Sequence, residues 1–133
     1  MFLEIYWAKE GVIIKVKIKG YLLNKNDNIK EEINTTSIKE NQIYKYINNN
    51  TKYILDLTNP NRITMIREND EMLHKMIFSS ESENTEYYIK EIRQSMNITI
   101  EDTKIQLQDN KIEINYKIKE TDNEYTYVME MGE

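Results

Sequence analysis

The sequence predicts an all-β protein built from antiparallel strands, and three observations support this. First, Ser95–Met131 contains three or four short segments in which every second residue is apolar: residues 96–100, 105–107, 112–118 and 125–131. A period of two places the apolar side chains on one face of a strand. Second, short polar turns separate these segments, as in an antiparallel meander. Third, Ala8 is the only alanine, so the best helix former is almost absent.

Further strands are predicted before this stretch. Val12–Lys19 alternates and ends at Gly20. Asn-rich turns and Pro60 then separate the later segments, which are Ile29–Ile38, Ile43–Ile47, Tyr53–Leu57, Ile63–Arg67, Glu71–Phe78 and Thr85–Ile92. Roughly ten strands with this spacing are typical of a barrel or a sandwich. Residues 38–47 and 69–78 also allow an amphipathic helix, although we prefer strands there.

Composition limits the classes of function. The 133 residues suggest one domain over 1–133 with no internal linker. The chain has no cysteine and one histidine, which excludes disulfides, thiol chemistry and histidine-rich metal centres. A net charge of −5 argues against a nucleic-acid partner. The apolar opening, Met1–Ala8, is too short to span a bilayer. We therefore expect a cytoplasmic protein with no membrane or nucleic-acid partner and no cofactor.

Three motifs resemble those of a known family. They are "ITMIRENDEMLHKMIF" (Ile63–Phe78), "TEYYIKEI" (Thr85–Ile92) and the tail "MNITIEDTKIQLQDNKIEINYKIKETDNEYTYVMEM" (Met96–Met131). In this order they resemble the YwiB-like family of small bacterial proteins of uncharacterised function. The resemblance covers roughly Ile13 to Met131 and implies an antiparallel, up-and-down, calycin/lipocalin-like β-barrel of roughly eight to ten strands. Residues 1–11 would be an N-terminal extension.

Single residues strengthen this resemblance, and two positions depart from it. Arg67, Phe78, Tyr87 and Tyr116 match landmarks of the family. Asn69 stands where the family usually has a glycine; asparagine tolerates positive φ, so the turn is expected to survive. Residues 91–95 replace a tyrosine-glycine step, which leaves the local strand register open.

A barrel of this size either fills with side chains or holds one small ligand, so inward polar residues are the candidate site. Arg67 shares the parity of Ile63 and Met65, and an inward arginine suits an acidic ligand head group or a structural ion pair. His74 lies on the apolar face of its strand and is more typical of a core residue than of a catalyst. The speculative ligand-binding set is Arg67, His74, Tyr87, Tyr116, Tyr125 and Tyr127; tyrosines there could equally be core packing.

Other polar groups carry less weight. Trp7 could cover one end of the barrel or belong to a mobile terminus. Carboxylate pairs such as Glu31 with Glu32, or Glu81 with Glu83, are interpreted as solvated charge rather than as a glycosidase pair. No metal site is predicted.

The favoured hypothesis is a barrel that is not an enzyme and binds a small apolar or amphipathic molecule in its interior. The alternative is a protein–protein interaction module with a filled core. Its partner would dock on an open edge such as Ile29–Ile38 or on Met1–Ala8. A third hypothesis is an enzyme that uses His74 or carboxylates inside the barrel. The sequence leaves the identity of the ligand and the oligomeric state open.

Overall fold

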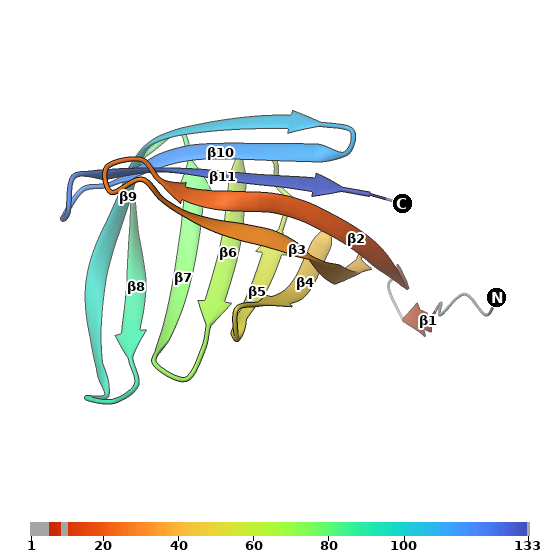
Figure 1. Cartoon of the computed structure of the whole chain (residues 1–133), viewed down its shortest axis with the longest axis horizontal. Coiled ribbons are helices and arrows are strands. Elements are labelled where there is room, and N and C mark those ends of the chain that lie inside the picture. Colours follow the sequence, from red (N-terminus) through yellow and green to blue (C-terminus); the bar gives the residue numbers. More distant parts are fainter. Residues whose placement is uncertain (1–5, 9–10, 133) are drawn as a thin grey trace.

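The structure is a computed structural model that describes the backbone of residues 6–8 and 11–132 and the side chains of residues 13–132. Every regular element in this part of the chain is a β-strand (Figure 1). The strands are β1 (Tyr6–Ala8), β2 (Gly11–Asn24), β3 (Ile29–Glu40), β4 (Ile43–Asn48), β5 (Thr51–Asp56), β6 (Arg62–Glu68), β7 (Met72–Ser79), β8 (Glu83–Ile89), β9 (Gln94–Gln108), β10 (Lys111–Ile118) and β11 (Asn123–Met131). No helix that could span a membrane occurs among these described residues.

The strands form a closed antiparallel barrel. From β3 to β11, each strand pairs with its neighbour in the sequence. The last strand, β11, then pairs with β2, and β2 pairs with β3, which closes ten strands into a ring. The short β1 pairs with residues 11–13 at the start of β2, beyond the part of β2 that pairs with β11. The predicted all-β barrel of eight to ten strands is confirmed.

The segments with helical alternatives, residues 38–47 and 69–78, are strands and a turn. At two positions the prediction was wrong in detail. The segments predicted at 96–100 and 105–107 are one continuous strand, β9, which bends at a bulge where Asp102 has a φ of 52°. Asn69 does not adopt positive φ. Instead, its Oδ1 accepts hydrogen bonds from the N–H groups of Glu71 (2.8 Å) and Met72 (3.1 Å), and these bonds hold the β6–β7 turn.

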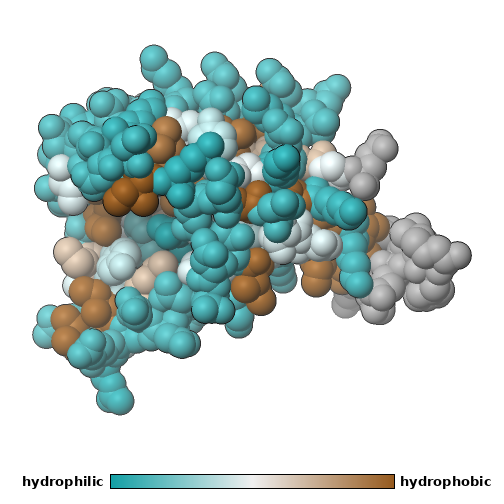
Figure 2. All heavy atoms as spheres, in the orientation of Figure 1, coloured by the Kyte–Doolittle hydropathy of each residue, from teal (hydrophilic) through white to brown (hydrophobic). Residues whose placement is uncertain are grey.

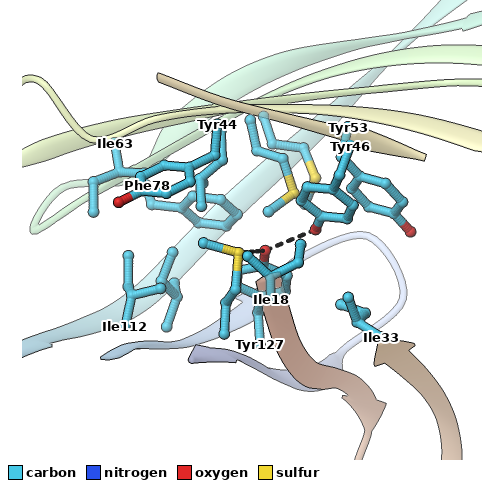
Figure 3. Close-up of a cluster of buried hydrophobic side chains, with 14 of the residues drawn as sticks. Ile18, Ile33, Tyr44, Tyr46, Tyr53, Ile63, Phe78, Ile112 and Tyr127 are labelled. Carbon is cyan, nitrogen blue, oxygen red and sulfur yellow. Dashed lines mark hydrogen bonds between the residues drawn. The ribbon is translucent and has the colours of Figure 1, made fainter. Parts of the chain in front are cut away.

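The core fills one part of the barrel interior (Figure 3). Ile63 and Phe78 are fully buried on one wall, and Ile18 and Ile112 face them from the other. Each buried aliphatic side chain contributes roughly 1.5–3 kcal/mol to folding through the surface it removes from water. This packing closes the region around Ile63, Phe78 and Ile112, so any interior space must lie elsewhere.

Open space begins where the strand ladders end. The first residues of β9, 94–98, pair with β8 on one side and with no strand on the other. Similarly, β3 pairs with β4 only over residues 38–40, so residues 29–37 have one unpaired edge. Both gaps lie at the barrel end that carries the β2–β3, β4–β5, β6–β7, β8–β9 and β10–β11 turns (Figure 1). We refer to this as the open end.

Candidate ligand pocket

Strand register brings the predicted polar residues into one row inside the barrel. Directly opposed residues on neighbouring strands form the series Tyr46–Tyr53–Arg67–His74–Tyr87–Met96, which runs from β4 to β9. On the facing wall, Tyr116 of β10 opposes Tyr125 of β11, and their rings stack with centroids 5.2 Å apart. A ligand near Arg67 would lie between this row and the Tyr116–Tyr125 pair, so it could contact side chains from both walls.

A pocket of about 270 Å³ lies between these two walls at the open end. Its polar members are Arg67, His74, Tyr87, Asn97, Tyr116, Glu120, Thr121 and Tyr125, and its apolar members are Leu22, Met76, Met96, Ile98 and Ile118. The unpaired edge of β9 and the β10–β11 turn border it. In Figure 2, hydrophobic side chains are visible in the hollowed region between the β10–β11 turn and the β8–β9 hairpin. Polar residues outnumber apolar ones in the lining, but most of the wall surface that faces the pocket is apolar, with the polar groups set into it.

His74 is a neutral residue of the pocket wall. Its side chain is 2% exposed, and its Nε2 lies 3.0 Å from Thr85 Oγ1. The Thr85 hydroxyl donates to the carbonyl of Ile98 at 2.7 Å, so it must accept the hydrogen bond from His74 Nε2–H. Nδ1 then carries the lone pair. Burial, with a smaller contribution from Arg67, lowers the pKa of His74 to about 4.

Arg67 is the most unusual group in the pocket. Its guanidinium carbon lies 5.6 Å from the centre of the Tyr53 ring, and its Nε–H is buried with no hydrogen-bond acceptor. No carboxylate of the described residues forms a salt bridge with it. Burial alone would lower the pKa of Arg67, but the neighbouring Tyr53, Tyr116 and Glu31 together outweigh it and the net pKa is raised. The side chain therefore stays charged.

A second chamber of about 270 Å³ lies on the other side of Leu22 and Tyr125, beneath the β2–β3 turn. It shares Arg67 with the first pocket and adds Asn24, Ile29 and Glu31. Glu31 was predicted to be solvated charge, whereas the structure turns it inward. Its carboxylate accepts hydrogen bonds from Tyr53 (2.9 Å) and Asn48 (3.0 Å). The sequence signal was its alternation with buried Ile33 on β3, which places Glu31 on the inner face.

Tyr127 belongs to the core and lines neither chamber. It is 1% exposed, and its hydroxyl lies 2.8 Å from that of Tyr46, as drawn in Figure 3. Burial raises the pKa of both phenols, which keeps them neutral. The other predicted residues, Arg67, His74, Tyr87, Tyr116 and Tyr125, do meet in the pocket. Trp7 and the Met1–Ala8 edge lie outside the described side chains.

A larger groove of about 690 Å³ runs over the outside of the barrel beside the β9 bulge. It mixes lysines with acidic residues, and its Lys117 is already paired with Asp122 at 2.7 Å. The carboxylate of Glu83 is likewise paired: it accepts a hydrogen bond from the Ser79 hydroxyl (2.7 Å) and forms a salt bridge with Arg62 (3.4 Å). Within the described residues, no group of three or more histidine or acidic side chains could hold a metal ion. The interior pocket is the better-defined site.

Comparison with known proteins identifies the fold. No protein-family model matches the chain, and no curated protein matches it in sequence. Among solved structures, the crystal structure of the YwiB protein from Bacillus subtilis matches with a TM-score of 0.60 and 15% sequence identity. The match covers 94% of this chain and 95% of that chain. This chain therefore shares the barrel fold of YwiB, as its sequence resemblance predicts.

Proposed function

We propose that this protein binds a small apolar or amphipathic molecule in the open end of its barrel and does not transform it. The observation that carries the proposal is the pocket of about 270 Å³ with mainly apolar walls and a few converging polar groups. Ligand sites in proteins have this character, with volumes of about 300–1,000 Å³. The pocket volume lies just below the lower limit of that range, which favours a small ligand.

The chemistry of the pocket favours binding over catalysis. His74 is a weak base because its pKa is about 4, and its Nε2–H is held by Thr85. A general base that works near neutral pH needs a pKa near that pH. Burial also raises the pKa of Tyr116, so its hydroxyl can act as a hydrogen-bond donor but not as an anion. These groups can orient a ligand without activating it.

The proposal can be tested by NMR titration with hexan-1-ol and hexanoate, which are small enough for the pocket. We expect amide shift changes confined to residues around the pocket. Met96→Trp, at the pocket mouth, should weaken binding about tenfold or more, which is about 1.4 kcal/mol. The matched control is Leu107→Trp, because Leu107 is also half-exposed on β9 (42%, against 50% for Met96) but lies beyond the bend and lines neither chamber.

Three results would contradict the proposal. The first is the absence of shift changes at millimolar concentrations of both compounds. The second is a set of shift changes spread over the outer surface. The third is equal weakening by Met96→Trp and Leu107→Trp, because that would place the binding site away from the pocket mouth.

A second candidate function, the interaction module, is supported by the unpaired edge of β3. Ile29 is 64% exposed, and residues 29–37 have no strand on their outer side. The edge is partly covered, since the side chain of Asn48 donates to the carbonyl of Glu32 at 3.0 Å. If this edge pairs with a second copy, sedimentation equilibrium should show a dimer that Ile29→Lys dissociates. A monomer at all concentrations would count against it.

A further inference from the structure

The interior of the open end carries one positive charge that forms no salt bridge with a carboxylate of the described residues. Among the described residues that line the two chambers, Arg67 is the only lysine or arginine. Its strand neighbour His74 is neutral, because its Nε2–H is used by Thr85 and its ring is buried. Burial raises the pKa of Tyr53 and Tyr116, the tyrosines that act on Arg67, so both are neutral as well. A buried arginine cannot shed its proton, so the charge persists in the ligand-free protein.

The nearby carboxylates are already engaged. Glu31 lines the second chamber, but it is held by Tyr53 and Asn48 and forms no salt bridge with Arg67. Glu120 lines the first pocket, where its Oε1 accepts the backbone N–H of Thr99 at 2.8 Å. Neither carboxylate forms a salt bridge with Arg67, and the buried Nε–H of Arg67 has no acceptor. Buried donors of this kind normally have a partner.

We propose, as a refinement of the function proposed above, that the ligand is a small carboxylate whose head group binds the Arg67 guanidinium and whose apolar body packs between Met76, Ile98 and Ile118. A planar carboxylate can accept from the Nε–H and an Nη–H at the same time. Tyr125 adds a donor, because its oxygen accepts only from Asn24 at 3.4 Å and its O–H remains available. Apolar side chains then surround the rest of the ligand.

The charge balance favours a carboxylate over a phosphate ester. One guanidinium matches one negative charge, whereas a phosphate monoester carries nearly two at neutral pH. Glu120 and Glu31 add negative charge at the two chambers and oppose a second charge on the ligand. Phosphate sites in proteins normally combine several cations or backbone N–H groups, and the described lining offers one arginine.

The experiment compares hexanoate with hexanamide, which has nearly the same shape and no charge, by NMR titration of the 133-residue chain. Wild type should bind hexanoate about tenfold or more tightly than hexanamide. Arg67→Met should remove this preference and leave hexanamide affinity within about twofold. The matched control is Arg62→Gln on the same strand, since Arg62 is exposed and pairs with Glu83 outside the barrel. It should retain the preference.

Thermal unfolding of the ligand-free proteins provides a second readout. If Arg67 is a buried charge without a salt-bridge partner, Arg67→Met should unfold at the same temperature as wild type or higher. A clear loss of stability would show that Arg67 serves a structural pair, and would overturn the inference. The same conclusion would follow if hexanoate and hexanamide bound wild type equally, or if inorganic phosphate bound as tightly as hexanoate. Failure of both six-carbon compounds to bind would instead overturn the proposed function itself.

Discussion

At the scale of single residues, Arg67 and His74 respond differently to the same burial. They oppose each other directly on β6 and β7, and both lie inside the barrel. Burial penalises a charge, and an imidazole can avoid this penalty by releasing its proton near neutral pH. A guanidinium has no such route. The pocket wall therefore combines the neutral imidazole of His74 with the permanent cation of Arg67. This arrangement suits a ligand that has a polar head group at one end.

The buried His74 makes stability depend on pH. The imidazole has a pKa of 6.5 when unperturbed and about 4 in the folded protein. Above pH 6.5 it is neutral in both states and adds no pH dependence. Between pH 6.5 and pH 4 the unfolded chain binds a proton that the folded chain does not, so the free energy of unfolding decreases as the pH is lowered. Below 4 the loss is complete, at roughly 3 kcal/mol.

Denaturant unfolding of wild type and His74→Gln at about pH 7 and about pH 4 measures this effect. Carboxylates titrate in both proteins, so the difference between the two curves isolates His74. Wild type should lose roughly 3 kcal/mol more than the variant on acidification. Parallel loss in the two proteins would show that His74 is protonated equally in the folded and unfolded states.

Sequence parity predicted several residue positions and missed others for physical reasons. Arg67 was expected to share a face with Ile63 and Met65, and it does. Parity cannot show that Arg67 lacks a carboxylate partner, because that depends on which strands lie opposite. Tyr127 has the inner parity of a pocket residue, yet it bonds to Tyr46, a residue 81 positions away in the chain. Contacts of this range follow from barrel closure.

At the scale of elements, β2 closes the ring of strands, because it pairs with both β3 and β11. Gly20 sits in this strand opposite Met129 of β11 and Ile33 of β3. A Cβ at Gly20 would overlap the backbone carbonyl of Val128. Backbone cannot swing aside as a flexible side chain can, so this position requires glycine.

Gly20→Ala should therefore destabilise the protein by about 3 kcal/mol, because β11 must shift to make room. The control is Gly132→Ala, in the residue that follows β11, where the nearest atom to an added Cβ is the Lys17 oxygen at 3.4 Å. This control should change stability by less than about 0.5 kcal/mol. Equal effects of the two substitutions in chemical denaturation would contradict the close approach of β2 and β11.

Element boundaries were predictable to the extent that local patterns determine them. Alternation located most of the strands, because it reports directly which face is buried. It could not show that residues 96–100 and 105–107 form one bent strand, since the bulge at Asp102 interrupts the alternation as a turn would. The Asn69 turn also differed from expectation, because a side-chain acceptor replaced the positive φ that a glycine would supply.

At the scale of the whole molecule, a closed ring of ten strands is filled at its centre and open at one end. The filling follows from large buried side chains such as Phe78 and Tyr53. The opening arises because β9 and β3 each extend beyond the ladder of a neighbouring strand. A sequence cannot predict this, since pocket volume is a small difference between barrel size and total side-chain volume. Whether the barrel interior holds a pocket or is filled with side chains could be decided only from the three-dimensional structure.

The most direct test is a crystal structure of the natively purified protein with hexanoate. The carboxylate is expected on the Arg67 guanidinium, with the carbon chain in the 270 Å³ pocket between Met76 and Ile118. The positions of Tyr125 and Glu31 should remain as in the ligand-free barrel. A pocket filled by side chains, with Arg67 turned into a salt bridge with Glu31 or Glu120, would contradict the account.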